Sequence, residues 1–173
     1  MKSFLIVCLF AVFIFFASQS FAESSYVLPY PSAMPGSVLY KFGLVREALM
    51  KYWYFGDFGE FKYNLSQSDK YLVEAETLFD YKQYLLGYQA LLTSNEYFEK
   101  IKPNLVSAEK HGKNVSNKMN LLKEAARKHI EELAKLKETV PENFLWQPEK
   151  QKSTNLHLWE TIDRSIGIRE EIL

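Results

Sequence analysis

Histidine and carboxylate side chains are the groups in this chain that could carry metal or acid–base chemistry. The three histidines, His111, His129 and His157, are far apart, and none lies three or four positions from another, the spacing that puts ligands on one helix face. Glu132 follows His129 by three positions, but a di-metal site in a bundle uses the order Glu-x-x-His, twice. We therefore predict no metal site, and we expect His129 at the edge of a core, donating to a helix carbonyl.

Motifs for nucleophilic or cofactor chemistry are missing from the sequence. It contains no Gly-x-Ser-x-Gly elbow and no glycine-rich phosphate loop. Cys8 is the only cysteine, and it lies in the N-terminal segment that we expect to be removed. The sequence therefore favours a protein that is not an enzyme and that uses no cofactor.

Aromatic side chains offer a different kind of candidate site. Tyrosine and tryptophan combine a flat apolar face with a polar edge, which suits a carbohydrate or peptide groove. The candidate binding surface consists of Tyr52, Trp53 and Tyr54 together with Trp146. The alternative is that the abundant aromatic residues simply fill the interfaces between helices.

Charge is balanced along the chain, with 21 basic and 21 acidic residues interspersed. A nucleic-acid-binding protein needs a concentrated basic face, so we predict no nucleic-acid partner. The same balance disfavours a polybasic protein of the membrane surface. Asp69 and Lys70 fall beside a predicted helix seam, where we expect a position at the rim, with a partly buried ion pair as the alternative.

Residues 1–22 have the three-part layout of a secretory signal peptide. Lys2 precedes an apolar run over 4–17, and Ser20-Phe21-Ala22 supplies small residues before the expected cleavage. Removal of 1–22 predicts an extracytoplasmic protein, periplasmic, on the cell surface or secreted. The alternative is retention as a membrane anchor, although the run is shorter than the roughly 20 residues that span a bilayer.

Residues 23–36 are predicted to form a proline-rich extended arm. Pro29, Pro31 and Pro35 each disfavour helix in the residue before them. The arm is too apolar for a plain linker, and we expect Leu28 and Tyr30, followed by Tyr40 in the first helix, to pack onto the domain.

Residues 37–141 are predicted to form a helical bundle domain, because apolar residues recur at spacings of three and four. The first helix is expected over 38–54, and the second begins after a cap at Asp57 and ends at 79. The third follows an apolar stripe from 84 to 105, which Pro103 kinks or ends. The fourth is expected over 115–139, after a cap at Asn114. The first predicted stripe is Leu39, Phe42, Val45 (or Arg46), Leu49 and Trp53. The second is Phe58, Phe61, Leu65, Ser68, Leu72, Ala75 and Phe79.

Residues 142–173 are predicted to form a loop followed by a C-terminal helix. The loop, over 142–152, is expected to be anchored by Phe144, Leu145 and Trp146, and the helix is expected over 154–173. No strand-like alternation of useful length is recognisable, so the predicted fold is all-α.

The stretch from Val27 to Tyr40 reads Val-Leu-Pro-Tyr-Pro-Ser-Ala-Met-Pro-Gly-Ser-Val-Leu-Tyr. It resembles the opening of a bacterial extracytoplasmic domain family of unknown function, whose members follow a signal peptide with Leu-Pro-Tyr-Pro-Gly-x-x-Pro-Asp-x-Pro-Leu-Tyr. Ser32, Gly36 and Val38 stand where that family often has Gly, Asp and Pro.

The resemblance extends over most of 26–142. The run Gly-Lys-Asn-Val-Ser at 112–116 is similar to a Gly-Lys-Asp-Val-Ser step of the family, and Ala126, His129 and Leu133 fall where it tends to have Ala, His and Leu. The resemblance implies an exported helical domain and supplies no catalytic residue, cofactor or ligand.

Together these patterns predict a mostly antiparallel bundle of four to five amphipathic helices behind a proline-rich arm. The function hypothesis is an exported, non-enzymatic module of the cell envelope that binds another macromolecule, an envelope protein or a glycan. One alternative is a bundle that binds a small ligand or glycan. Another is a membrane-anchored envelope regulator, which requires that 1–22 be retained.

Overall fold

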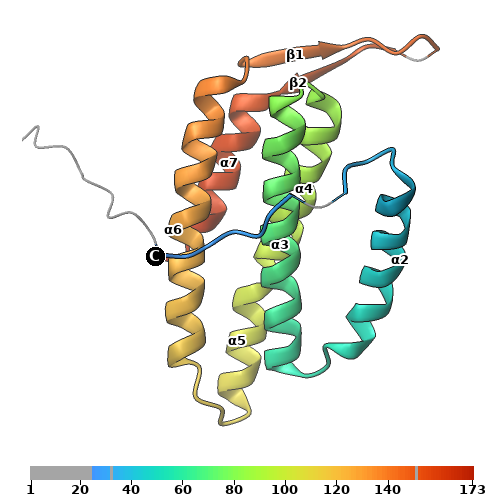
Figure 1. Ribbon diagram of the computed structural model, residues 1–173. Coiled ribbons are helices and arrows are strands. Elements are labelled where there is room, and N and C mark those ends of the chain that lie inside the picture. The colour runs from blue at the N-terminus through green and yellow to red at the C-terminus, as the bar shows by residue number, and fades with distance from the viewer. Residues whose placement is uncertain (1–24, 32, 151) are drawn as a thin grey trace, which may run out of the picture.

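The structure, a computed structural model, describes residues 25–31, 33–150 and 152–173, so the predicted signal peptide, 1–22, lies outside the described residues. The described chain is mainly helical and confirms the predicted all-α bundle (Figure 1). Its elements are α2 (Val38–Trp53), α3 (Asp57–Asp80), α4 (Tyr84–Glu99), α5 (Ile101–Lys110), α6 (Ser116–Thr139), β1 (Asn143–Trp146), β2 (Thr154–His157) and α7 (Leu158–Glu170).

Helices α3 and α4 form the predicted antiparallel hairpin around a tight turn. Lys82 adopts a positive φ of 59°, and the amide of Gln83 donates to the carbonyl of Leu78 at 2.8 Å. Gly87 lets the two helices approach closely, since a Cβ there would lie 3.0 Å from the ring of Phe79. A larger residue at this position would push the hairpin apart.

The third predicted helix is divided into α4 and α5 at Lys100, as Pro103 indicated. Pro103 has no amide hydrogen, so it cannot donate to the carbonyl of Glu99 four positions earlier. At the junction the amide of Lys100 donates to the carbonyl of Tyr97, three positions earlier, at 3.2 Å, and α5 begins with Pro103 in its first turn.

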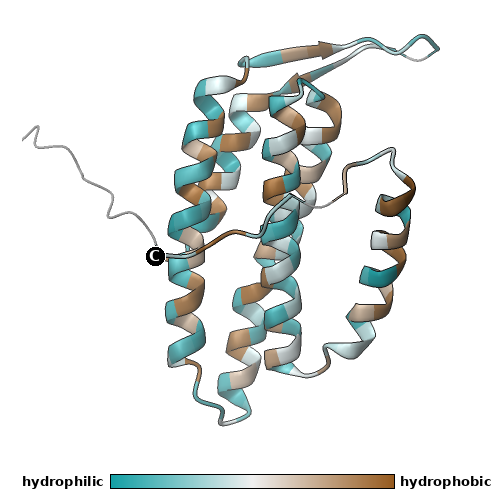
Figure 2. Ribbon diagram, viewed as in Figure 1, coloured by the Kyte–Doolittle hydropathy of each residue, from teal (hydrophilic) through white to brown (hydrophobic). Residues whose placement is uncertain are grey.

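The predicted seam of α3 lies in the core of the bundle, where Leu72 and Ala75 are completely buried. Figure 2 shows teal and brown segments alternating along α6, as expected for a helix with one buried face. One core cluster lies near the hairpin and α7, and the other lies near α5. The second cluster comprises Phe61, Leu65, Phe98, Ile101, Leu105, Leu122, Ala125 and Ala126.

Two predicted caps shift by one residue. Gly56 caps α3 in place of Asp57, whose carboxylate accepts hydrogen bonds from His111 at 2.8 Å and Lys113 at 3.0 Å. These bonds lower the pKa of the Asp57 carboxyl and tie the start of α3 to the turn between α5 and α6. Val115 is the N-cap residue of α6, while Asn114 Oδ1 accepts from the amide of Ser116 at 2.9 Å.

The prediction of a loop over 142–152 and one long helix over 154–173 is wrong for the C-terminal region. β1 pairs antiparallel with β2, with Phe144 opposite Leu156, and α7 begins only at Leu158. Phe144 and Trp146 project to one side of β1 and pack against the core, whereas Leu145 between them is exposed. Each strand is four residues long, so its alternation is too short to stand out in the sequence.

The proline-rich arm crosses α3 and α6 and is docked, and of the three residues predicted to pack, Leu28 and Tyr40 do so whereas Tyr30 does not (Figure 1). Tyr26 donates to Asp69 Oδ2 at 2.5 Å, and Leu28 and Met34 pack against the core. Tyr30 is 96% exposed, which contradicts its predicted packing, while Tyr40 is partly buried and bonds to α3 as expected.

Candidate functional site

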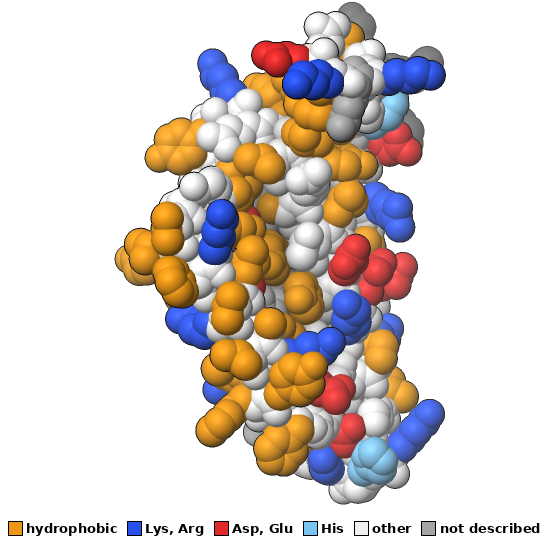
Figure 3. All heavy atoms as spheres, turned by 90° about the vertical axis from the view of Figure 1, so that its right-hand side faces the viewer, with side chains coloured by type: hydrophobic (Ala, Val, Ile, Leu, Met, Phe, Trp, Pro, Cys, Tyr) orange, Lys and Arg blue, Asp and Glu red, His pale blue; other side chains and the backbone are white. Residues whose placement is uncertain are grey.

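Helix α2 turns its apolar side to solvent, which contradicts the predicted buried stripe. We name this side the outward α2 face and define it as Val38, Leu39, Phe42, Val45, Leu49 and Trp53. These six side chains are between 60% and 79% exposed. Figure 3 shows many hydrophobic side chains on that side of the molecule, with Lys and Arg side chains among them.

A set of polar contacts holds the opposite side of α2 to the bundle. Glu47, the buried residue of α2, accepts from Lys70 at 2.5 Å and from the Tyr71 hydroxyl at 3.2 Å. Tyr40 donates to Glu74 Oε1 at 3.0 Å. Lys70 therefore lies in a partly buried ion pair, the alternative left open by the sequence. We name Tyr40, Glu47, Lys70, Tyr71 and Glu74 the polar anchor.

Burial gives the polar anchor an unusual electrostatic character. Desolvation raises the pKa of Glu74, and the second oxygen of this carboxylate has no hydrogen-bond partner. Lys70 lies 3.9 Å from that oxygen and compensates part of its charge. Desolvation, followed by the charge of Glu74, raises the pKa of Tyr40, so its hydroxyl stays protonated and able to donate.

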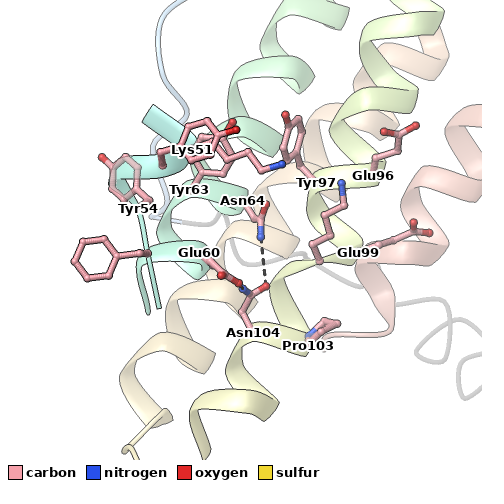
Figure 4. A pocket seen from close by; sticks show the side chains of 13 residues that line it. Lys51, Tyr54, Glu60, Tyr63, Asn64, Glu96, Tyr97, Glu99, Pro103 and Asn104 are labelled. Carbon is pink, nitrogen blue, oxygen red and sulfur yellow. Dashed lines mark hydrogen bonds between the residues drawn. The ribbon is translucent and has the colours of Figure 1, made fainter. Parts of the chain in front are cut away.

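The predicted aromatic surface is divided by the fold. Tyr52 and Tyr54 line an open pocket of about 870 Å³ between α2, α3, α4 and α5 (Figure 4). Trp53, between them in sequence, lies outside this pocket on the outward α2 face. Trp146 packs against the core from β1, at the end of the bundle opposite the α2–α3 turn (Figure 1). The four residues therefore do not form one site.

The pocket contains a tyrosine series that the sequence did not identify. Tyr63 contacts Tyr54 and Tyr97 with ring centroids 6.0 and 5.9 Å apart, and Tyr97 stacks on Tyr71. Beside the rings, Asn64 donates to Asn104 at 3.3 Å, and Asn104 donates to Glu60 at 2.8 Å (Figure 4). Apolar rings next to amides and a carboxylate are suited to a ligand that carries both flat apolar and hydroxyl surfaces.

The most concentrated set of polar groups lies inside the bundle. Arg169 is completely buried and donates to His129 Nδ1 at 3.0 Å, while His129 Nε2 lies 2.8 Å from Asp69. Further guanidinium bonds reach Asn95, at 2.7 Å, and Ser94, at 3.0 Å. Arg169 can only donate, so His129 Nδ1 accepts and Nε2 carries the proton that bonds to Asp69. We name Asp69, Ser94, Asn95, His129 and Arg169 the core network.

This arrangement corrects two expectations. His129 lies in the interior and not at a core edge, and Asp69 is buried beside it and not at the rim. Desolvation lowers the pKa of His129 and lowers that of Arg169 to about 9, so the histidine is neutral and the arginine cationic at neutral pH. Asp69, Asn95 and Arg169 come from α3, α4 and α7, so the sequence gives no local pattern that joins them.

The core network is not built to act on a substrate. A general base needs a free nitrogen within reach of a substrate proton. Both ring nitrogens of His129 are engaged, and its side chain is inaccessible to solvent. The groups instead satisfy one another, which is the condition for burying charge.

Within the described ranges, no group of three or more histidine, cysteine or carboxylate side chains is placed to hold a metal ion. No helix of the described chain combines the length and apolar character needed to span a bilayer. Comparisons of the chain with known protein families, curated proteins and solved structures find no match.

Proposed function

We propose that this protein is an exported, non-enzymatic helical module that binds another macromolecule through the outward α2 face. The observation that carries the proposal is the orientation of α2. The six large apolar residues of the outward α2 face are exposed, while the buried side of the helix is held by the polar anchor.

An exposed surface of this kind is unusual for an isolated domain. Soluble proteins rarely expose a large contiguous apolar patch that serves no contact, because its hydration is unfavourable. The buried hydrophobic residues of the bundle core belong to α3–α7 and to the β1–β2 hairpin, so the core is complete without α2. The outward α2 face is therefore free to bind a partner without unfolding the domain.

Two further observations support a binding role over catalysis. The titratable groups of the core network are shielded from solvent and mutually bonded. The sequence also contains no nucleophile elbow and no phosphate loop. Export remains a proposal based on the layout of residues 1–22.

The second candidate function is binding of a small ligand or glycan in the tyrosine-lined pocket. It is favoured by the rings of Tyr54, Tyr63 and Tyr97 beside the amides of Asn64 and Asn104. An envelope regulator that signals across the membrane would additionally require retention of 1–22.

Photo-crosslinking in the cells that produce the protein tests the proposed function. A photoreactive amino acid at Val45 on the outward α2 face should give an adduct after irradiation, and one at Val106 on α5 should not. Val106 is a suitable control because it is also an exposed valine on a helix. Equal labelling at the two positions, or none at Val45, would contradict binding through α2. N-terminal sequencing of the recovered protein separately decides whether 1–22 is removed.

A further inference from the structure

The exposed charges of α2 all have the same sign. Lys41, Arg46 and Lys51 are exposed, whereas the only acid of the helix, Glu47, is turned inward and paired with Lys70. The balance between acids and bases in the whole chain conceals this local excess. Lys51 lines the pocket between α2 and the bundle, so Lys41 and Arg46 are the charges beside the outward α2 face.

The basic residues also flank the apolar side. At 100° per residue, Phe42, Val45 and Leu49 lie close to one line along the helix, with Lys41 and Arg46 on either side of it. A stripe of apolar residues bordered by lysine and arginine is the pattern of helices that lie in the plane of a membrane interface.

Aromatic residues extend this surface at both ends. Trp53 of the outward α2 face is 79% exposed, and its neighbours Tyr52 and Phe55, which also line the pocket beside α2, are more exposed still. Near the N-terminal half, Tyr30 of the arm lines a groove of about 550 Å³ with Leu39, Phe42 and Arg46. Tryptophan and tyrosine favour the headgroup level of a bilayer, where an apolar ring and a polar edge are both satisfied.

From this geometry we infer that the outward α2 face lies in the interface of an anionic lipid bilayer, with α2 parallel to the membrane plane. The inference rests on the part of the proposed function that makes the outward α2 face a contact surface, and it specifies a membrane surface as what that face contacts. The basic residues of α2 are complementary in charge to anionic lipid headgroups, which favours a bilayer over a second copy of the chain. A second copy of the chain, packed face to face, would bring Lys41 and Arg46 of both copies together without acidic partners on α2, whereas anionic headgroups neutralise them.

Vesicle sedimentation with the full chain, as recovered from cells, tests the inference. Binding to vesicles of phosphatidylcholine and phosphatidylglycerol should exceed binding to phosphatidylcholine alone. Leu49→Asp should weaken it at least tenfold, while Leu145→Asp, the same change at an exposed leucine of β1, should not. Arg46→Gln should weaken it about fivefold, and Arg164→Gln on α7 should leave it unchanged. All variants share the same N-terminus, so their differences report on α2.

A second readout locates the contact. Brominated lipids quench a tryptophan that reaches the acyl boundary, so they should quench wild-type emission more than that of Trp53→Phe. Equal vesicle binding by wild type and Leu49→Asp, or equal quenching of wild type and Trp53→Phe, would overturn the membrane inference. If the Val45 photo-adduct then contains a protein, the proposed function survives with a different partner. If there is no adduct either, both proposals fail.

Discussion

Helices α2 and α7 reverse the usual placement of side chains in opposite ways. Helix α7 carries the fully buried cation Arg169 into the interior, whereas α2 leaves six large apolar side chains in solvent. Both helices have an apolar periodicity, so hydropathy alone predicts that each helix buries its apolar side. The difference shows that a helix side is buried when its groups find partners there, whatever their polarity.

The two arrangements differ in how completely those partners are supplied. In the core network, Arg169 bonds to side chains from α4 and α6 and to the carbonyl of Ser165 in its own helix. In the polar anchor, one oxygen of Glu74 has no hydrogen bond. We therefore expect α7 to be held much more strongly than α2.

The largest expected effect is that of Arg169→Ala. It leaves Asn95, Ser94 and His129 without their donor inside the bundle, and breaking a buried charged network costs about 3–5 kcal/mol. Chemical denaturation should show this loss, and Arg169→Lys should lose less because one charged donor remains. Arg164→Ala, at an exposed arginine of the same helix, is the control. Similar stability of the two alanine variants would show that the core network does not hold α7.

Paired leucine truncations compare α2 with the bundle directly. Leu72→Ala removes a completely buried side chain from α3, so the free energy of unfolding should fall by about 2–5 kcal/mol. Leu49→Ala on the outward α2 face should change it by no more than about 0.5 kcal/mol. Thermal melts of both variants check this, and a large loss at Leu49 would mean that α2 buries its apolar side.

The arm offers a smaller contrast between two tyrosines. Tyr26→Phe removes the donor to Asp69 Oδ2 and should cost about 1–3 kcal/mol, because that acceptor is buried. Tyr30→Phe makes the same change at a residue that is 96% exposed and should be neutral. Equal denaturation curves for the two variants would show that the arm is not docked through Tyr26.

Glu76 on α3 is a largely buried acid with a raised pKa, and its carboxylate is not fully hydrogen-bonded. Burial, and then Glu132 and Asp80, raise its pKa from 4.5 to about 7, and Glu76 Oε1 has no hydrogen-bond partner. The folded state binds this proton more tightly than the unfolded state, so the wild type loses stability as the pH rises from 4.5 to 7.

Replacement by an uncharged amide should therefore stabilise the protein at neutral pH. Glu76→Gln should raise the free energy of unfolding by about 1–3 kcal/mol at pH 7, and the gain should vanish towards pH 4.5. Denaturation at several pH values measures the difference, with Glu138→Gln on exposed α6 surface as the control. A gain that did not depend on pH would contradict the assigned titration.

The helices and most of the buried sides could be predicted because their signals are local. Apolar spacing located α3 to α6, and Pro103 indicated the break before α5. In these helices the apolar side is also the buried side, so the seam through Leu72 and Ala75 is confirmed.

The remaining features depend on partners that are distant in sequence. The orientation of α2 depends on Lys70 and Glu74, which lie on α3 and supply its polar contacts. The β1–β2 hairpin depends on four paired positions in each strand, too few for a recognisable alternation. The tyrosine-lined pocket shared only Tyr52 and Tyr54 with the predicted surface, because its other rings come from α3 and α4.

The long reach of Arg169 also has a consequence for the order of folding. The side chains to which it donates lie 40 to 75 positions earlier in the chain, so they are synthesised before α7 exists. Contacts between distant segments form late because closing a long loop costs entropy. We therefore expect an assembly intermediate of α3, α4 and α6 with a polar slot between them. Only one register of α7 brings the guanidinium to that slot. Helix α7 can therefore dock fully only when α3, α4 and α6 are already correctly aligned with one another.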